Sequence, residues 1–380
     1  MTDNIKLDTN IVWAPGFAAL ADALSHFLTD LSPTKVMVVA DFGSHTHCYP
    51  LLQQMLPEHG LVVLQGGEHH KDMEALGDIL NALANLKADR HSLVINLGGG
   101  MVGDVGGMAA AMYMRGIQFL NVPTTLLAMV DASVGGKTGV NFNGIKNLVG
   151  SFRLPTMVLI SPIWLSTLPE REIKAGLAEM LKHGLIADPV GFAELALAIQ
   201  ALVIPRRPLH ELEFAYWIPH SVKIKAAIVA EDFEEIGPRK QLNLGHTVAH
   251  ALEAEAQKAP ITDILHGEAV ALGIWVEAIL AYRMLTLQRE ELESIEQACL
   301  ALVPDQQLEV LIQAHPDDLI LTMLMDKKNK DGQIRAVLLR KIGETLIDRP
   351  VTIPEMQWAI SKAQERAKLM LQNRPKPTDQ

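Results

Sequence analysis

The sequence has few of the residues that would assign it to a disulfide-rich or membrane-spanning class. Only 2 of its 380 residues are cysteines, Cys48 and Cys299, which argues against a disulfide framework and favours a reducing compartment. No apolar run reaches the length of a membrane span, because Glu277 and Arg283 interrupt the most apolar helical stretch. The opening residues MTDNIKLDTN show no signal-peptide pattern. We therefore expect a cytoplasmic protein with no membrane partner.

Positive charge is scarce as well. Lysine and arginine number 33 against 44 aspartate and glutamate residues, which gives a net charge of −11. A dedicated nucleic-acid binder needs a basic surface to neutralise phosphates, so we expect no nucleic-acid partner. Hydrophobic residues make up 49% of the chain, which is enough for a sizeable core and, at this length, for two domains. An enzyme acting on a small molecule fits these proportions.

Two regions of different pattern divide the chain. In residues 1–161, apolar runs alternate with helical spacing, which predicts a parallel sheet covered by helices. The predicted strands are 35–40, 61–64, 92–97, 118–122 and 157–160, with a helix at 72–86. Residues 162–380 are mainly helical to 317, with breaks at Pro189, 205–208, Pro260 and Pro304, a β-like piece at 334–339, a last helix from about Pro354 and a frayed tail from 373. We expect an α/β nucleotide-binding domain, then a mostly helical metal- and substrate-binding domain, with the site in the cleft between them.

The densest motif is GGGMVGDVGG at 98–107, which follows a predicted strand and opens a helix. Glycines there let the backbone approach a pyrophosphate, and the helix N-terminus supplies N–H groups, although a tight turn has the same pattern. A second cluster at 124–147 combines glycines with two lysines and an amide: Thr124, Thr125, Asp131, Gly135, Gly136, Lys137, Thr138, Lys146 and Asn147. We interpret the pair as an anion cradle; the alternative for the second cluster is a solvated glycine-rich loop.

Metal-type ligands gather in the helical half. His246 and His250 stand four apart, which places them on one helix face, and His266 follows in LHGE. Glu179 and Lys182 share a face of another predicted helix. A single histidine in such segments is more often a packed or surface residue, but three beside glycines, with a carboxylate, indicate a catalytic Zn²⁺ site with open positions for substrate oxygens.

Basic residues are unevenly placed in this acidic chain. One group precedes the histidines and another precedes residue 334: Lys223, Lys225, Arg239, Lys240, Lys327, Lys328 and Lys330. A solvated face accounts best for Lys223, Lys240 and Lys330. The others indicate a substrate with more than one negative charge. The residues alone therefore predict a dinucleotide, a divalent metal and a phosphorylated, hydroxylated small molecule.

The sequence also resembles a known family. GGGMVGDVGGMAAAMYMRGIQFLNVPTTLLAMVDASVGGKTGVN, KNLVGSF, AGLAEMLKHGLI, LNLGHTVAHALEAE, LHGEAVALG and DKKNKDGQIRAVLLRKIG, in this order, are similar to the motifs of 3-dehydroquinate synthase. The resemblance implies a Rossmann-like N-terminal domain at 1–161, a mainly helical domain at 162–380, NAD⁺, Zn²⁺ or Co²⁺, and a homodimer. It also implies the conversion of 3-deoxy-D-arabino-heptulosonate 7-phosphate to 3-dehydroquinate and phosphate in the shikimate pathway, by transient oxidation, phosphate elimination, re-reduction and aldol closure.

The same resemblance implies residue roles. The metal ligands would be Glu179, His246 and His266. The phosphate would be held by His250, Lys137, Asn147 and Lys328, the last favoured over Lys327. The carboxylate and hydroxyls would be oriented by Lys225, Arg239 and Asn243, the polar shell completed by Asp131, Lys146 and Lys182, and Arg115 would reach the partner subunit's phosphate site. The cofactor would contact Asp41, Glu68, Lys71, Gly99, Gly100, Asp104, Thr124, Thr125, Asp131, Lys137, Lys146 and Thr167.

The sequence departs from the family pattern in three places. ADFGSH at 40–45 replaces the usual TDxN, so only Asp41 carries over at the adenosine side. Ala249 replaces a glycine before His250, and the loop 256–264 is longer than typical.

Other functions are possible for a chain of this pattern. A related cyclase, of the 2-epi-5-epi-valiolone or 2-deoxy-scyllo-inosose synthase type, would not need the carboxylate-binding Arg239. A metal-dependent alcohol or glycerol dehydrogenase would not need the phosphate cradle. Nothing in the sequence favours a non-catalytic regulator.

Overall fold

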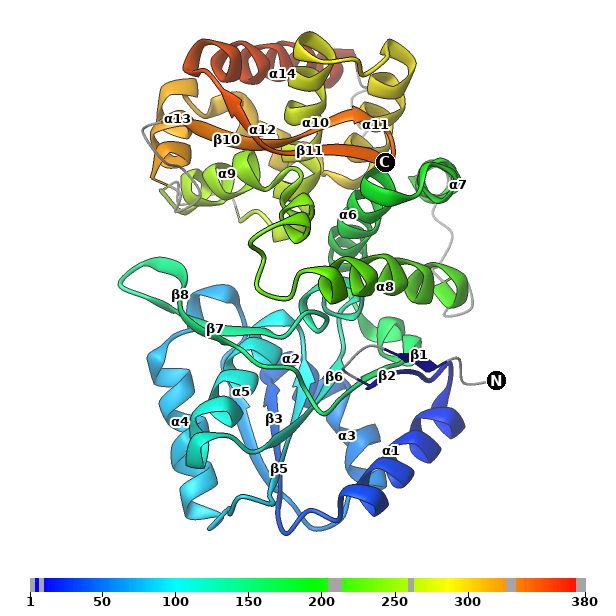
Figure 1. Ribbon diagram of the computed structural model, residues 1–380, viewed down its shortest axis with the longest axis vertical. Helices are drawn as coiled ribbons and strands as arrows, with labels where there is room; N and C mark the ends of the chain where they lie inside the picture. The colour runs from blue at the N-terminus through cyan, green and yellow to red at the C-terminus, as the bar shows by residue number, and fades with distance from the viewer. Residues whose placement is uncertain (1–3, 7–9, 204–213, 259–262, 326–332, 374–380) are drawn as a thin grey trace, which may run out of the picture. The chain divides into compact units, whose positions relative to one another are not determined.

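The protein is described by a computed structural model that covers residues 4–6, 10–203, 214–258, 263–325 and 333–373 (Figure 1). The chain folds into two units: unit 1 is Met1–Gly176 with Leu209–Glu234, and unit 2 is Leu177–Pro208 with Glu235–Gln380. This division differs from the predicted domain boundary, which lies between residues 161 and 162. Unit 1 takes in helix α8 (Phe214–Glu231), whose buried face packs on the turn Ala128–Ala132 of the same unit. Helix α6 (Glu170–Ala187) begins in unit 1 and continues in unit 2.

Unit 1 is built on a seven-stranded sheet of order β1-β2-β9-β6-β5-β3-β4. Its strands are β1 (Asn4–Lys6), β2 (Asn10–Trp13), β3 (Val36–Asp41), β4 (Gly60–Leu64), β5 (Leu93–Gly98), β6 (Gln118–Pro123) and β9 (Met157–Ile160). The ladders from β2 to β4 are parallel, and only β1 is antiparallel to its neighbour. Strands β5 and β9 are buried along their whole length, as expected for strands covered on both faces. All five predicted strands are confirmed.

Helices cover this sheet on both sides (Figure 1). They are α1 (Phe17–Leu31), α2 (Phe42–His47), α3 (Tyr49–Leu52), α4 (Met73–Asn85) and α5 (Gly100–Met112). The predicted helix at 72–86 is α4, which begins after Asp72 because that side chain accepts hydrogen bonds from the N–H groups of Glu74 and Ala75, both at 2.9 Å. In α5, a side chain at Gly106 would collide with the Asn96 amide on β5. Part of the glycine-rich motif thus serves close packing of helix on sheet.

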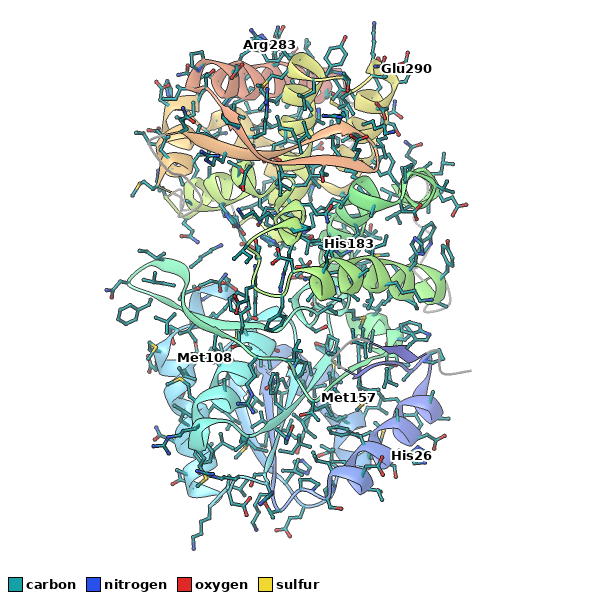
Figure 2. All side chains as sticks on the ribbon, viewed as in Figure 1. His26, Met108, Met157, His183, Arg283 and Glu290 are labelled. Carbon is teal, nitrogen blue, oxygen red and sulfur yellow. The ribbon has the colours of Figure 1, made fainter. Side chains whose placement is uncertain are left out.

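A hairpin that the sequence pattern did not predict lies against α5. It consists of β7 (Lys137–Phe142) and β8 (Ile145–Phe152), paired antiparallel. Thr138 on β7 donates a weak hydrogen bond, 3.9 Å long, to the sulfur of Met108 on α5 (Met108 in Figure 2). The glycine-rich cluster from 135 onward is therefore a strand pair packed on a helix rather than a solvated loop.

Unit 2 is mostly helical, as predicted. Besides the second half of α6 it contains α7 (Pro189–Val203), α9 (His246–Lys258), α10 (His266–Met284), α11 (Arg289–Leu302), α12 (Asp305–Gln313), α13 (Pro316–Leu324) and α14 (Ile353–Asn373). A hairpin of β10 (Ile334–Lys341) and β11 (Glu344–Val351) adds a small sheet, of which the sequence predicted only the first strand. Helix α10 is buried on nearly all sides and forms the core between α9, α11 and α14.

Two of the predicted chain breaks can be compared with the structure. Pro189 is the first residue of α7, and Pro304 is the N-cap of α12, so both breaks are confirmed. The predicted breaks at 205–208 and Pro260 and the frayed tail after 373 lie outside the described residues. Within the described part of the chain, no helix is long and apolar enough to cross a membrane.

Candidate functional site

The predicted pyrophosphate motif lies where the connections of the sheet change direction. Strand β4 is the neighbour of β3 toward one edge of the sheet, whereas β6 is the neighbour of β5 toward the opposite edge. The carboxyl ends of β3 and β5 therefore flank a topological switch point, the place where open parallel sheets bind nucleotides. Asp41 is the last residue of β3, and Gly99 is the N-cap of α5 directly after β5. The α5 N-terminus at this position offers backbone N–H groups to an anion.

A buried ion pair lies beside this helix N-terminus. Lys71 Nζ is 2.6 Å from Asp104 Oδ2 on the second turn of α5 and 3.6 Å from Glu68 Oε1. Burial alone would lower the pKa of Lys71, but Asp104 and Glu68 together outweigh it and raise that pKa. Burial raises the pKa of Asp104, and Lys71 only partly offsets this. Asn141 of β7 donates to Glu68 Oε1 at 3.3 Å, so the hairpin joins the same group. The structure thus brings three of the predicted cofactor residues together.

The remaining predicted cofactor residues of unit 1 occupy strand ends and turns. Asp41 caps α2 by accepting from the Ser44 N–H at 2.7 Å, which fixes its carboxylate at the end of β3. Thr124 is buried after β6, and its N–H donates to the Gly98 carbonyl at 3.0 Å. Thr125 Oγ1 accepts from the Ala128 N–H at 3.1 Å and lies beside Gly99. Thr167 lies at the end of a 3-10 turn, where its hydroxyl donates a hydrogen bond to the Trp164 carbonyl.

Asp131 and Lys225 form a second buried pair in unit 1. Asp131 lies in the π-helical turn Ala128–Ala132, and Lys225 lies on α8. The Lys225 ammonium donates to Asp131 Oδ1 at 2.7 Å and to the Asp131 backbone carbonyl at 2.5 Å. Two acceptors from one residue fix the ammonium group in place. The sequence predicted both residues but gave no sign that they contact one another.

The predicted phosphate residues of the hairpin are not adjacent. Lys137 begins β7 opposite Phe152, whereas Lys146 and Asn147 follow the turn at the other end, where Phe142 pairs with Ile145. At about 3.3 Å per residue, the hairpin separates the two lysines by roughly 15 Å. The backbone positions of the two lysines therefore lie toward opposite ends of the hairpin. Lys327, Lys328 and Lys330 lie outside the described residues.

The three predicted metal ligands come together in unit 2. Glu179 Oε1 is 3.7 Å from His246 Nε2 and 3.4 Å from His266 Nε2. The three ligand atoms all lie within 4.8 Å of one another. Tetrahedral Zn²⁺ with bonds of about 2.0–2.1 Å places neighbouring ligand atoms about 3.3 Å apart. Two imidazole nitrogens and one carboxylate oxygen at this spacing are a fitting donor set for a catalytic divalent ion.

The surroundings of these ligands determine which atoms face one another. Lys182, one turn along α6, is ion-paired with Oε2 of the fully buried Glu179, while Oε1 faces both histidines. His246 Nδ1 is 3.1 Å from the Leu244 carbonyl, which leaves Nε2 toward Glu179. Burial alone would lower the pKa of His266, but Glu253 and Glu179 raise it to about 10. In the metal-free chain, the His266 imidazolium therefore provides positive charge next to Glu179.

Helices α9 and α10, which carry the histidines, are in contact at Gly245, the residue before α9. The Gly245 N–H donates to Glu277 Oε2 of α10 at 2.6 Å. Gly245 has a φ of 81°, and a side chain there would approach Ile274 to 2.6 Å. A side chain at Gly273 would in turn collide with the Gly245 carbonyl. These contacts fix the start of α9, and so the backbone of His246, on α10.

The predicted substrate residues of unit 2 lie near this start. Arg239 is buried in the 3-10 turn Pro238–Asn243, and Asn243 donates to Glu235 Oε1 at 2.6 Å. The His250 ring is 5.6 Å from that of His246, edge to face. In unit 1, Arg115 is exposed with a φ of 65° after Met114, whose φ is 48°.

Sequence reasoning missed several carboxylates of the site. Glu253 contacts His266 Nδ1 at 3.2 Å, Glu277 bonds Gly245, and Glu235 accepts from Asn243. A signal for Glu253 was present, since it follows His246 by seven residues and therefore lies on the same face of α9. Glu277 and Glu235 depend on contacts between segments, which no spacing rule gives.

Comparison with known proteins identifies the family of this chain. A family model described as 3-dehydroquinate synthase N-terminal matches residues 61–175, and one described as 3-dehydroquinate synthase C-terminal matches residues 176–329. The chain belongs to the 3-dehydroquinate synthase family. The 3-dehydroquinate synthase of Parabacteroides distasonis is 38% identical over 338 residues, which cover 88% of this chain and 92% of that protein. The 3-dehydroquinate synthase of Saccharophagus degradans is 43% identical over 331 residues, covering 84% and 87%.

Solved structures confirm the predicted fold class. A 2-epi-5-epi-valiolone synthase from Streptomyces hygroscopicus with NAD⁺ and Zn²⁺ bound has a TM-score of 0.81 and 29% identity, covering 96% of this chain and 99% of that one. A 2-deoxy-scyllo-inosose synthase with carbaglucose-6-phosphate, NAD⁺ and Co²⁺ shares the fold, with a TM-score of 0.79 and 23% identity over 95% and 99% of the two chains. A probable glycerol dehydrogenase from Sinorhizobium meliloti is more distant, with a TM-score of 0.61 and 16% identity over 94% and 97% of the two chains. The chain therefore has the fold that 3-dehydroquinate synthase shares with other cyclases.

Proposed function

We propose that this protein converts 3-deoxy-D-arabino-heptulosonate 7-phosphate to 3-dehydroquinate and phosphate, acting as a carbon–oxygen lyase. The observation that carries the proposal is the approach of two imidazole nitrogens to the single oxygen Glu179 Oε1, at 3.4 and 3.7 Å. It occurs in a chain that is 37–43% identical to 3-dehydroquinate synthases over most of its length.

The residues present fit the two cofactors that this activity needs. Glu179, His246 and His266 would hold Zn²⁺ or Co²⁺, and the switch point between Asp41 and Gly99 would hold NAD⁺, with the Lys71–Asp104 pair beside the α5 N-terminus. When bound, the metal supplies Lewis acidity toward the reacting hydroxyl, and NAD⁺ supplies a reversible hydride acceptor, so the reaction has no net oxidation.

The chain's own residues would bind the two charged ends of the substrate. The buried guanidinium of Arg239 suits a bidentate grip on a carboxylate, with Asn243 oriented by Glu235 beside it in the same turn. His250, one turn along α9 from His246, would contact the phosphate, together with Lys137, Asn147 and Lys328. The bidentate geometry of the guanidinium favours a carboxylate-bearing substrate over a sugar phosphate that lacks a carboxylate.

Two lysines would hold charge at fixed positions. Lys225 is fixed by both acceptors of Asp131, so its ammonium can orient a substrate hydroxyl or carboxylate without rearrangement. Lys182 neutralises Oε2 of Glu179, which keeps Oε1 as the atom that faces the histidines. The predicted polar shell thus has a physical role even before substrate enters.

A related cyclase activity is the second candidate, because the 2-epi-5-epi-valiolone synthase structure matches almost the whole chain. The test is phosphate release from 3-deoxy-D-arabino-heptulosonate 7-phosphate, sedoheptulose 7-phosphate and glucose 6-phosphate, each with NAD⁺ and Zn²⁺ and each repeated with EDTA. Release from the first substrate alone, abolished by EDTA, supports the proposal. Release only from one of the two sugar phosphates that lack a carboxylate would indicate one of the other cyclase activities.

We further propose that the protein acts in the cytoplasm as a homodimer, in which Arg115 reaches the partner's phosphate site. Its exposure supports this role, since an exposed guanidinium is available to a partner subunit. Mixing Arg115→Ala with inactive Lys225→Met chains and allowing exchange should restore one site per mixed dimer. No recovered activity after proven exchange would contradict the role of Arg115.

A further inference from the structure

We infer that Glu253 is a positioning residue of the metal centre, whose carboxylate holds the His266 ring so that Nε2 points to the metal. The inference deepens the proposed function and rests on its metal site. It concerns one contact, 3.2 Å between Glu253 Oε1 and His266 Nδ1, within unit 2.

The two nitrogens of His266 have different carboxylate partners. Nδ1 meets Glu253, and Nε2 meets Glu179 Oε1 at 3.4 Å. An ionised carboxylate only accepts hydrogen bonds, so Glu253 requires a proton on Nδ1. With the proton at Nδ1, the Nε2 lone pair is available to a metal. Histidine ligands in proteins commonly have such a carboxylate or carbonyl partner on their other nitrogen.

His266 needs this partner more than His246 does. The His246 side chain is 12% exposed, and its Nδ1 bonds the Leu244 carbonyl two residues away, so local backbone fixes its ring. The His266 side chain is 34% exposed and begins helix α10. Glu253 is 8% exposed and comes from α9, thirteen residues earlier. A buried side chain on a neighbouring helix therefore orients the more exposed ligand.

Loss of this contact would affect the metal rather than the fold. Without Glu253, the partly exposed ring loses the contact that holds Nδ1 and can rotate, so Nε2 is no longer held toward the metal. Substitution of such partners typically weakens metal binding by about 10–100-fold. Glutamine at the same position keeps an oxygen acceptor for the Nδ1 proton, so Glu253→Gln should lose less than Glu253→Ala.

The experiment measures Zn²⁺ affinity of the full, metal-stripped chain by competition with a chromophoric chelator. Wild type is compared with Glu253→Ala, Glu253→Gln and the control Glu255→Ala, which removes a carboxylate of the same helix that pairs with Lys258 at 2.7 Å. In zinc-loaded, ¹⁵N-histidine-labelled samples, the rate at which the His266 Nδ1 proton exchanges with solvent reports whether that proton is held in a hydrogen bond. Thermal unfolding of the metal-free variants records any change in the fold.

We expect Glu253→Ala to weaken Zn²⁺ binding by about 10–100-fold and to speed the solvent exchange of the His266 Nδ1 proton. Glu253→Gln should recover most of the affinity, and Glu255→Ala should match wild type. Unchanged Zn²⁺ affinity and unchanged exchange of the Nδ1 proton in Glu253→Ala would overturn the inference, as would a lower unfolding temperature as its only effect. If Glu253→Ala does not fold, Glu253→Gln and Glu253→Asp decide by the same two readouts. A wild type that binds no Zn²⁺ would instead refute the proposed metal site itself.

Discussion

Replacing Lys71 with methionine would separate the contribution of the Lys71–Asp104 pair to the stability of unit 1 from its proposed role in binding NAD⁺. Methionine keeps the apolar stem of a side chain that is 3% exposed but removes the ammonium 2.6 Å from Asp104. Breaking a buried pair costs about 3–5 kcal/mol. Because the Asp104 side chain is 21% exposed, water can partly solvate the unpaired carboxylate, and we expect a loss of stability at the low end of this range, about 3 kcal/mol. For a unit of this size that lowers the unfolding midpoint by about 6–12 °C.

The loss of stability in Lys71→Met should depend on pH in a defined direction. Burial already raises the pKa of Asp104, and removal of Lys71 raises it further. The folded state then holds a proton more tightly than the unfolded chain, whose aspartate pKa is about 3.9. Stability therefore falls as pH rises from the unfolded pKa through the raised folded pKa. Lys71→Met should be closer to wild type at pH 5 than at pH 8.

A double variant provides the control. Lys71→Met with Asp104→Leu replaces both charges by apolar groups and should recover most of the lost stability, since no charge is left unpaired. NAD⁺ affinity, measured by calorimetry, should be lost in both variants. An unfolding midpoint of the single variant within about 1 °C of wild type at both pH values, by scanning calorimetry, would contradict the predicted cost of breaking the pair.

Three further predictions concern the metal, the substrate and the thiols. Glu179→Gln or His246→Ala should abolish turnover through loss of metal; full metal content with a near-normal rate in either variant would remove that residue from the ligand set. Arg239→Ala should raise KM for 3-deoxy-D-arabino-heptulosonate 7-phosphate roughly 10–100-fold, because a charge-assisted hydrogen bond contributes about 1.5–3 kcal/mol; steady-state kinetics with unchanged kcat/KM would exclude Arg239 from recognition. Burial raises the pKa of Cys48 to about 12 and also raises that of Cys299, so thiol reagents should label neither at pH 8 until the chain unfolds; rapid labelling of the native protein would show that one of the thiols is accessible.

Much of the fold could be predicted because its elements have simple local patterns. Strands such as β5 and β9 are continuous apolar runs between polar breaks, and α4 begins at an aspartate cap. The β7–β8 hairpin was missed because its glycines, such as Gly139 and Gly150, resemble a loop in sequence. These two are needed for close strand contact instead, since a side chain at Gly139 would lie 2.7 Å from the Val149 carbonyl.

The sequence pointed to residues of the candidate site but not to their contacts. The family motifs pointed to Glu179, His246 and His266 as metal ligands, and the structure brings these three side chains together. That Lys182 pairs with Glu179 Oε2 follows from helix spacing, whereas the Lys225–Asp131 bond joins residues 94 apart. Such long-range pairs depend on the packing of α8 against the turn Ala128–Ala132 of unit 1, which periodicity along the chain does not encode.

The most direct test of the proposed activity follows phosphate, 3-dehydroquinate and NADH together in one reaction. The purified protein is supplied with NAD⁺, Zn²⁺ and 3-deoxy-D-arabino-heptulosonate 7-phosphate, and products are quantified by NMR and absorbance. We predict one phosphate released for each 3-dehydroquinate formed, with no net NADH over many turnovers. NADH that accumulates with substrate consumption, without phosphate release, would contradict the proposed activity and indicate a dehydrogenase.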